Sequence, residues 1–437
     1  MNKADVLIIG AGAAGLMAAC TLAKAGKKVT VIEARDRCGG RIYTLNSERL
    51  FYAMELGAEF VHGNLPLTLK LLNEAGIPYY AATGEMWQYR NGSFGNEGGF
   101  MPDWFLLMAR LEKLEHDTSI EDFLQTEFPG DEYYDLKKAV RRFVHGYDTA
   151  ETQRVSAFAL RNEWTAEDDD SQYRIKGGYS GIITCLEDDV KRAMGVIHLN
   201  AVVKDIHWQP CNVKAVTDNG TVYEAAQVLV AVPLGVLQAA DGAKGAIAFY
   251  PPIPEQKDAI KLMGFGAIIK ILLEFKEPFW EDELSEVLAG KSLKNMGFLL
   301  SGEEIPTWWT QVPKHSSVLT GWLGGPPAME KKDMPTEEIL RRSLRSLSNI
   351  FKRDPEELKA KLVAHYIVNW TNEPFTRGSY AYDTMEAPAS REVLNAPVNN
   401  TIFFAGEYLY DGQAMGTVEA ALTSGEDVAK RMINMAL

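Results

Sequence analysis

The sequence predicts an α/β protein of two domains, in which a domain built on a parallel sheet is interrupted by an α+β domain. Apolar strand runs occur near the start of the chain, at 226–232, where Pro233 ends the run, and at 402–405. Between them lie stretches of helical periodicity, such as 104–114 and 136–145, with tryptophans and no similar glycine turns. The chain has 437 residues, which is enough for about two or three domains.

Three glycines form a motif directly after the first apolar strand. Gly10, Gly12 and Gly15 form a GxGxxG pattern where an apolar strand over 6–9 meets a helix. Gly10 allows a tight turn, Gly12 lets a pyrophosphate approach the backbone, and Gly15 lets helix and strand pack closely. This strand, turn and helix are typical of a Rossmann-like dinucleotide-binding domain.

The second strand, over 29–32, leads into further candidate ligands. It ends at Glu33, whose carboxylate suits a pair of ribose hydroxyls and repels a 2′-phosphate. Ala34 and Arg35 follow in "EARDRCGGRIYT", and then Gly40 and Arg41. The glycine pair and the arginine would bring a second backbone loop and a guanidinium to the same pyrophosphate. Up to Glu33 the pattern does not choose between NAD and FAD.

The "GGR" extension resembles a motif of the flavin-containing amine oxidases, a family that includes monoamine and polyamine oxidases. The resemblance runs nearly from end to end of the chain. It implies a Rossmann-like FAD-binding domain assembled from residues 1–78, 176–258 and 395–437. The intervening segments, 79–175 and 259–394, would form a discontinuous α+β substrate-binding domain.

The resemblance implies further cofactor-binding residues. The segment "ELGAEFVHG" resembles the one that passes the flavin, and a helix that begins near Thr417 would aim its N–H groups at the flavin pyrimidine. Ser379 stands where mammalian monoamine oxidases have a flavin-linked cysteine, so the FAD is expected to be non-covalent. The other implied contacts are Ala14, Gly57, Ala58, Glu59, Val203, Gly406, Glu407, Gly416 and Val418.

Lys270 stands in the apolar run "FGAIIKILLEF". A buried lysine must be paired, neutral or in contact with water. The run by itself favours a lysine that snorkels from a strand edge. The resemblance implies instead the lysine that holds a water against flavin N5.

Two aromatic residues and Lys270 are the catalytic residues that the resemblance implies. Trp370 would stand beside the flavin, and Tyr380 would form one wall of an aromatic cage that orients the amine. The second cage tyrosine of monoamine oxidases aligns with Thr417, which would also line the substrate site. Phe60 and His62 are expected to line that site as well; His62 could equally be a hydrogen-bonded loop histidine.

The implied reaction is FAD-dependent oxidation of a C–N bond. The amine α-carbon transfers hydride to flavin N5, the imine hydrolyses to an aldehyde plus an amine or ammonia, and O2 reoxidises the flavin to give H2O2. His62, Thr417 and the net charge of −14 favour a diamine or polyamine substrate. The acidic run Asp168–Asp170 is interpreted as a solvated loop.

Several alternatives share these motifs. A monoamine oxidase is one, and an L-amino-acid oxidase is another, although such relatives have a carboxylate-binding arginine in the region where this chain has Phe60. A carotenoid desaturase or porphyrinogen oxidase would have little use for Lys270 with Trp370 and Tyr380. A histone-type substrate is not expected, because no long helical insertion is present. The non-enzymatic alternative is a redox-inactive flavin-binding scaffold.

Composition bears on partners and location. A pI near 5.1 argues against nucleic acid or an anionic membrane as a partner. The four cysteines form no metal-like cluster and indicate reduced thiols. The uncharged stretch 6–23 contains the glycine motif and is not interpreted as a membrane span. We expect a cytoplasmic protein that uses a small-molecule amine and O2 and holds no metal. The sequence does not determine its oligomeric state.

Overall fold

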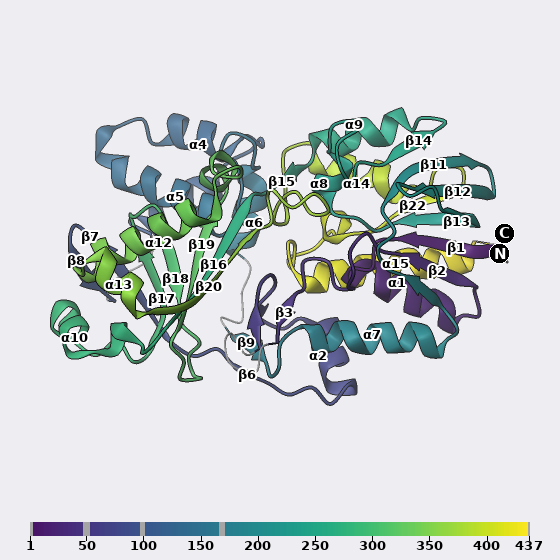
Figure 1. The fold of residues 1–437 in the computed structure, drawn as a ribbon. Coiled ribbons are helices and arrows are strands. Elements are labelled where there is room, and N and C mark those ends of the chain that lie inside the picture. The colour runs from purple at the N-terminus through teal and green to yellow at the C-terminus, as the bar shows by residue number, and fades with distance from the viewer. Residues whose placement is uncertain (1–2, 47–52, 97–100, 166–170, 436–437) are drawn as a thin grey trace.

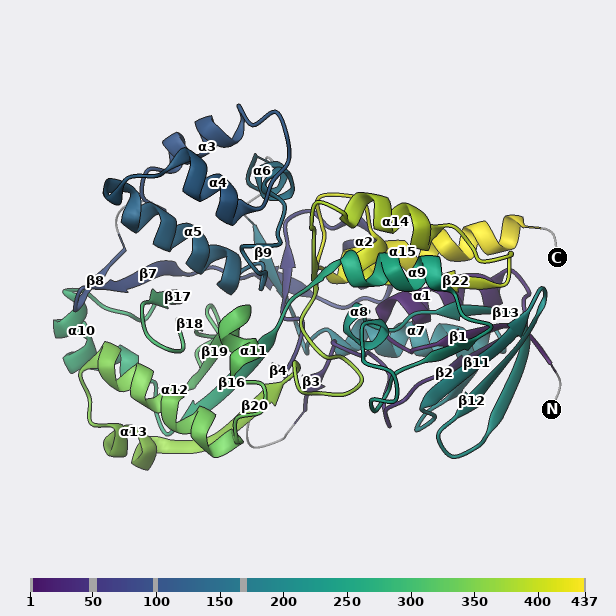
Figure 2. The ribbon, with the colours of Figure 1, turned by 90° about the horizontal axis from the view of Figure 1, so that it is seen from above.

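A mostly parallel sheet forms one half of the computed structural model, which describes residues 3–46, 53–96, 101–165 and 171–435. Figures 1 and 2 show this half beside a second half with its own sheet, and both chain ends lie on the outer side of the first half. Within the described residues the first sheet has the order β10-β2-β1-β13-β12-β11-β14, with β22 paired to β13. The strands are β1 (Ala4–Ile9), β2 (Val29–Ile32), β10 (Val196–His198), β11 (Val203–Gln209), β12 (Asn212–Thr217), β13 (Val222–Val230), β14 (Ala248–Tyr250) and β22 (Ile402–Phe404).

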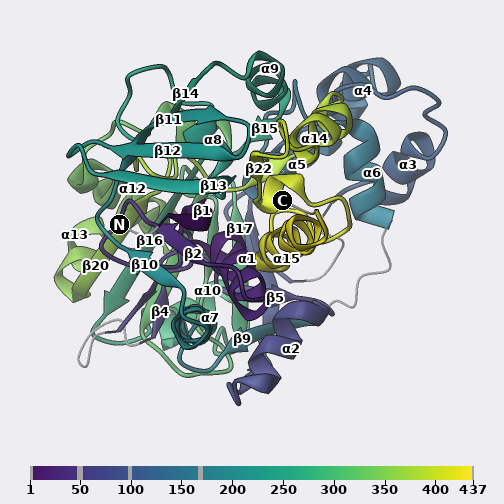
Figure 3. The same cartoon turned by 90° about the vertical axis from the view of Figure 1, so that its right-hand side faces the viewer.

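The centre of this sheet confirms the Rossmann-like prediction. Strand β1 runs parallel to β2 and to β13, so that Ile9 pairs with Ile32 on one side and with Val230 on the other. Both faces of β1 are covered, which explains its almost continuous aliphatic sequence. Figure 3 views the stack of strands from the outer side, with the helices α1 and α15 beside it.

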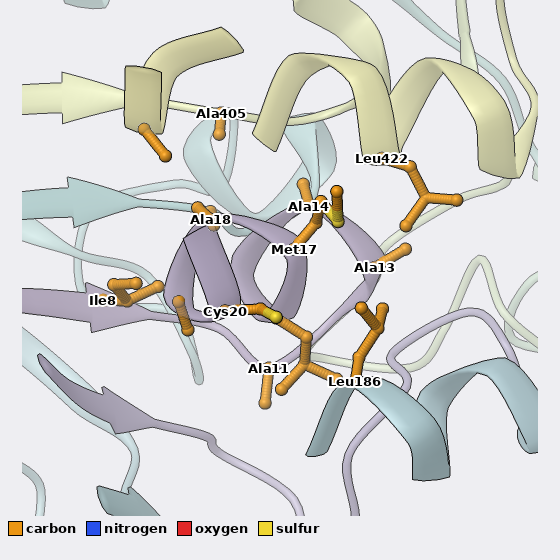
Figure 4. Close-up of a cluster of buried hydrophobic side chains, with 14 of the residues drawn as sticks. Ile8, Ala11, Ala13, Ala14, Met17, Ala18, Cys20, Leu186, Ala405 and Leu422 are labelled. Carbon is orange, nitrogen blue, oxygen red and sulfur yellow. The ribbon is translucent and has the colours of Figure 1, made fainter. Parts of the chain in front are cut away.

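Helix α1 (Ala13–Lys24) packs between α15 (Val418–Asn434) and α7 (Ser180–Arg192). Figure 4 shows Leu422 of α15 and Leu186 of α7 on either side of the small residues of α1. The approach of α15 is close, because a Cβ on Gly425 would lie only 2.2 Å from the carbonyl oxygen of Ala14. The carboxyl-terminal helix is thereby held against the helix that follows the first glycine turn.

A second sheet, mainly antiparallel, forms the other half. Its order is β20-β16-β19-β18-β17-β7-β8, and only the pairing of β17 with β7 is parallel among the described residues. Helix α12 (Thr336–Phe351) covers it with an apolar face that includes Leu347 and Phe351. The strands are β7 (Glu85–Arg90), β8 (Ser93–Gly95), β16 (Ile268–Phe275), β17 (Met296–Ser301), β18 (Thr307–Trp309), β19 (Val318–Gly324) and β20 (Leu362–Asn369).

The position of Lys270 overturns the snorkelling interpretation. Its strand, β16, lies between β20 and β19 and is therefore not an edge strand. Lys270 pairs with Val368 on one side and Trp322 on the other, and it is only 1% exposed. The ammonium must find its partners inside the molecule.

Short sheets join the two halves. Strands β5 (Phe60–His62) and β6 (Tyr79–Ala81) flank β9 (Gln172–Ile175), and two small pairs combine β3 (Thr44–Leu45) with β4 (Met54–Glu55) and β15 (Gly264–Phe265) with β21 (Ala381–Tyr382). Figure 2 shows α3 to α6 gathered over one end of the second sheet. The remaining helices are α2 (Pro66–Glu74), α3 (Trp104–Leu111), α4 (Ile120–Glu127), η1 (Asp131–Tyr133), α5 (Tyr134–Gly146), α6 (Ala157–Thr165), α8 (Leu234–Leu237), α9 (Pro254–Leu262), η2 (Phe279–Glu281), α10 (Glu283–Ala289), α11 (Pro326–Glu330), α13 (Pro355–Lys361), α14 (Ala387–Asn395) and η3 (Glu407–Leu409).

Some local expectations need correction. The helix expected over 104–114 ends at Leu111. The division into two discontinuous domains stays a prediction; α14, which it assigns to the second domain, packs against α9 and β22. Asp168–Asp170 lie outside the described residues. Within the described ranges, no helix is long and apolar enough to cross a membrane.

The contact between α15 and α1 gives a first prediction. Gly425→Ala should lower the free energy of unfolding by about 1–3 kcal/mol, because the added methyl meets the Ala14 carbonyl and forces the helices apart. Chemical denaturation measures the change. Asp427→Ala, on the exposed face of the same helix, should change stability by less than about 0.5 kcal/mol. Equal effects of the two variants would contradict this account.

Candidate active site

A continuous cavity of about 500 Å³ lies between the two sheets. At one end it is bordered by the glycine turn after β1 and by the start of β11. It then passes the segment before β5 and reaches Lys270, Trp370 and Tyr380. The cavity therefore connects the edge of the parallel sheet, where dinucleotides bind in this type of fold, to a buried lysine on the second sheet.

Two glycine loops lie together at the first end of the cavity. Gly12 pairs with Gly39 as an isolated bridge, and the Gly39 N–H donates to the carbonyl oxygen of Ala11 at 2.8 Å. Gly10, Gly39 and Gly40 have positive φ angles, which favour glycine. A Cβ on Gly12 would have no neighbour within 4 Å, so this residue presents bare backbone to open space. The arrangement suits a pyrophosphate at the start of α1.

Glu33 borders the same end and is already fixed by backbone groups. Its carboxylate accepts hydrogen bonds from the N–H of Ala11 at 2.8 Å and of Arg35 at 2.9 Å. The side chain is buried but borders the cavity. Since a carboxylate has further lone pairs, Glu33 can still accept hydroxyl donors from a ribose.

Arg41 and Glu407, which both border the cavity, form an ion pair. Arg41 Nη1 lies 2.9 Å from Glu407 Oε1 and also donates to the carbonyl oxygen of Ser379. Glu407 accepts a second hydrogen bond from the Ala381 N–H at 3.2 Å. The pair connects the loop after the first glycine motif to the segment that follows β22.

Trp370 and Tyr380 are both held by backbone carbonyls. Trp370 Nε1 donates to the carbonyl oxygen of Leu56 at 2.8 Å, and the Tyr380 hydroxyl donates to that of Tyr147. A Cβ on Gly416 would lie 3.0 Å from the Tyr380 ring. Burial raises the pKa of Tyr380 well above its usual range, so its hydroxyl stays protonated. Both rings are thus fixed at the border of the cavity.

Lys270 is paired with Glu59. Its Nζ lies 2.7 Å from Glu59 Oε2 and donates a second hydrogen bond to the carbonyl oxygen of Gly57 at 3.1 Å. The same Nζ lies 5.4 Å from the centroid of the Trp309 ring. An ammonium has three N–H donors, so one remains after these two bonds.

Glu59 also binds a second cation. Its Oε1 accepts from Arg174 Nη1 and, at 2.9 Å, from Trp309 Nε1. Burial opposes ionisation of Glu59, but Lys270 and Arg174 outweigh it and lower the pKa of Glu59 to about 2. Arg174 is held in turn by the carbonyl oxygen of Thr310 at 2.9 Å. The sequence reasoning did not find Arg174 or Trp309, because neither stands in a motif.

His62 lies among aromatic rings at the cavity wall. Its ring centroid is 5.9 Å from that of Phe60 and 6.4 Å from that of Tyr147. Burial lowers the pKa of His62 to about 4, so the imidazole is neutral at pH 7. It therefore adds no charge to this part of the cavity.

The cavity brings together nearly all the residues that the sequence singled out. Gly15 is the exception: a Cβ there would lie 1.9 Å from the Gly10 carbonyl oxygen, so its place is in helix–strand packing. The individual roles of the others stay predictions. Those that border the cavity are Gly10, Gly12, Ala14, Glu33, Ala34, Arg35, Gly40, Arg41, Gly57, Ala58, Glu59, Phe60, His62, Val203, Lys270, Trp370, Tyr380, Gly406, Glu407, Gly416, Thr417 and Val418.

A Rossmann-like parallel sheet lies beside a second, mainly antiparallel sheet, and the cavity between them suits a dinucleotide. The sequence model of the flavin containing amine oxidoreductases matches residues 13–86 and 92–433. The chain belongs to the flavin containing amine oxidoreductase family, which confirms the resemblance found in the sequence.

The relatives have varied activities. Lysine-specific histone demethylase 1 homolog 3 of Arabidopsis thaliana is 28% identical over all of this chain, which spans 30% of that relative. This chain spans 57% and 50% of the length of two other demethylase relatives. Polyamine oxidase 2 of Arabidopsis thaliana is 27% identical, with 98% of this chain and 89% of the relative covered. The structure of putrescine oxidase bound to putrescine has a TM-score of 0.79, 22% identity and 99% coverage of both chains, which shows the common fold.

The residues present fit FAD. The open backbone at Gly12, the carboxylate of Glu33 and the paired glycine loops match the needs of a pyrophosphate and a ribose. At the far end, Thr417 caps α15 by accepting from the Ala420 N–H at 3.2 Å, which leaves earlier N–H groups of that helix for a ring carbonyl. Among the residues that the structure describes, no group of His, Cys, Asp and Glu is arranged for a metal.

Gly12 separates cofactor binding from folding. Gly12→Ala should leave stability within about 0.5 kcal/mol of the wild type, because Gly12 has an ordinary φ of −76° and free space for a methyl. The methyl occupies the place of the pyrophosphate, so the Kd for FAD should rise at least about 10-fold. Flavin fluorescence titration measures it. Gly95→Ala, also with free space but on β8 outside the cavity, should retain FAD; loss of FAD in both variants, or in neither, would contradict this role.

Glu55 makes stability depend on pH. Burial raises the pKa of Glu55 to about 7 from an ordinary 4.5, although the Tyr179 N–H donates to it at 2.5 Å. The folded state therefore binds more protons than the unfolded state between these values, so this stabilisation is complete below pH 4.5 and is lost as pH rises through 7. The free energy of unfolding of the wild type relative to Glu55→Gln should fall by roughly 3 kcal/mol across that window.

Denaturation of both proteins at several pH values measures this difference. Glu115→Gln, an exposed change of the same kind, should run parallel to the wild type. A wild-type curve that also runs parallel to that of Glu55→Gln would show that Glu55 does not titrate in this range.

Proposed function

We propose that this protein is an FAD-dependent amine oxidase that oxidises a C–N bond and uses O2 as the acceptor. The observation that carries the proposal is the single cavity that joins a dinucleotide cradle to Lys270, Trp370 and Tyr380. Bound FAD supplies the hydride acceptor at N5 and passes the electrons to O2, with H2O2 as product, and the oxidised amine hydrolyses to an aldehyde plus an amine or ammonia.

The chain positions the reacting groups. Trp370 and Lys270 both hold the segment that passes the flavin, through the carbonyl oxygens of Leu56 and Gly57. The third N–H of Lys270 would hold a water at the position of flavin N5. Glu59 fixes the direction of this lysine, because one of its oxygens binds Lys270 while the other binds Arg174 and Trp309.

The substrate amine reacts in its neutral form. The aromatic wall of Tyr380, Trp309 and Phe60 would orient the amine and its α-carbon. His62, neutral at pH 7, would not repel it. The acids that border the cavity are already bonded, so no residue is assigned as a general base, and none is required when the amine enters without its proton.

The FAD is proposed to be non-covalent. Ser379 replaces the flavin-linked cysteine of some family members, and its hydroxyl lies 2.6 Å from that of Thr149. Acid precipitation should therefore release all flavin into the supernatant.

The sequence favours a diamine or polyamine as substrate, with a monoamine as the alternative. The described carboxylates are a poor match for a second ammonium, because Glu33, Glu59 and Glu407 are the acids that border the cavity and each has donors already. Asp148 lies near Tyr380 but does not border the cavity, and burial together with Glu163 raises its pKa well above the usual range.

Anaerobic reduction tests the reaction itself. The purified holoenzyme is mixed with spermine, spermidine, putrescine, benzylamine, tyramine and L-amino acids, and the flavin absorbance is followed. Bleaching by at least one amine, followed by H2O2 formation on admission of air, is expected. A flavin that no amine bleaches would favour the redox-inactive scaffold, and bleaching without reoxidation by air would overturn O2 as acceptor.

Lys270→Met tests the proposed lysine. The variant should keep FAD, because Lys270 bonds to Gly57 and Glu59 and not to the glycine loops, but reduction or reoxidation of the flavin should slow at least about 10-fold. Stopped-flow absorbance measures each half-reaction separately. Lys276→Met, just beyond β16 and exposed, should match the wild type. Unchanged rates in both half-reactions would remove Lys270 from the mechanism.

A further inference from the structure

The end of the cavity away from the glycine loops is basic. Arg90, the last residue of β7, and Arg142, in the second half of α5, both border it. Gln88 on β7 and Thr307 on β18 also border this outer region, together with Met86 and Leu300. Arginine side chains at the end of an amine-binding cavity would repel a second ammonium.

Arg142 is half-buried and makes no ion pair or hydrogen bond with any residue in the described ranges. A Cβ on Gly302, in the turn between β17 and β18, would lie 3.7 Å from Arg142 Nη2, which places the guanidinium beside this turn. Burial and the neighbouring Arg90 lower the pKa of Arg142, yet an arginine stays charged at pH 7. A partly buried cation without a counter-ion is stabilised by an anion.

Unlike Arg142, the neighbouring Arg141 has an ion-pair partner. Arg141, on the same helix, forms an ion pair with Glu121 at 2.6 Å and does not border the cavity. The two arginines thus differ in what faces them: one has a carboxylate from the protein, and the other has the cavity.

Aromatic residues line the cavity between Arg142 and Lys270. Phe298 lies 5.6 Å from Phe60 and 5.9 Å from Trp309, measured between ring centroids. Trp309 lies in turn 5.8 Å from Trp322. All four rings border the cavity. A molecule that reaches from Lys270 to Arg142 must therefore have an apolar or aromatic body.

We propose that Arg142, assisted by Arg90, binds a carboxylate at the far end of the substrate, so that the enzyme oxidises amines with an apolar body and a distal carboxylate. The planar guanidinium can donate two parallel N–H bonds to such a group. This inference rests on the proposed amine oxidase function and names the substrate class for the same cavity. In the proposed substrate, a carboxylate stands where a diamine has its second ammonium.

A matched set of substrates tests the inference. It comprises para-(aminomethyl)benzoate, para-methylbenzylamine and para-(aminomethyl)benzylamine, which differ only in carrying a carboxylate, a methyl or a second amine. Linear ω-amino carboxylates of increasing length, each with its alkylamine, cover longer spans. Steady-state KM and kcat are measured for the wild type, Arg142→Met, Arg142→Lys and the control Arg141→Met.

The carboxylate substrates should have the lowest KM with the wild type. Arg142→Met should raise that KM about 10- to 100-fold, with kcat less affected, and should leave the KM of the neutral amines within about 2-fold. Arg142→Lys should recover part of the loss, and Arg141→Met should match the wild type. Inhibition by benzoate and longer carboxylates, read from the flavin spectrum, should weaken in Arg142→Met alone.

Two failures remain distinct. When no amine of any kind reduces the flavin, the proposed function is wrong. When neutral amines or diamines react as well as the carboxylates, or when Arg142→Met raises the KM of all three classes equally, the amine oxidase function stands and the carboxylate site is wrong.

Discussion

The ion pair between Glu59 and Lys270 is the interaction on which the site depends. Both groups are almost fully buried, and Glu59 is the carboxylate that pairs with the Lys270 ammonium there. Removal of one partner from such a pair generally costs about 3–5 kcal/mol, because it leaves a buried charge uncompensated. Arg174 and Trp309 complete the environment of the carboxylate. The network joins β9 and the segment before β5 to β16 and β18, and so connects the small linking sheet to the second large sheet.

The same network holds one wall of the cavity in place. The segment 56–59 is held through backbone carbonyls by Trp370 and Lys270 and through its one carboxylate by Lys270, Arg174 and Trp309. On the other side of the cavity the glycine loops are held by backbone hydrogen bonds, with bare backbone exposed at Gly12. A cofactor placed on the glycine loops would thus meet rigid partners at its reactive end.

The charged groups that border the cavity do not follow the net charge of the chain. The chain is strongly acidic, with a net charge of −14, but the acids that border the cavity are neutralised by their own partners. Two arginines, Arg90 and Arg142, border the outer end. Net charge describes long-range attraction, whereas specificity depends on the few groups that touch the ligand. The preference for a cationic substrate drawn from composition therefore has little force inside the cavity.

The sequence by itself determined the parallel-sheet fold and the family, and it predicted the cofactor cradle. These depend on local patterns, because the glycine spacing from Gly10 to Gly15, the strand that ends at Glu33 and the helix that begins near Thr417 each involve only neighbouring residues. Only the tertiary structure decided the partners of Lys270 and the opposite circumstances of Arg141 and Arg142. Glu59 and Lys270 are separated by 211 residues, and no local pattern records which distant carboxylate meets a buried ammonium. Adjacent arginines look alike in sequence, but a helix turns successive side chains in different directions, and packing decides which one faces the cavity.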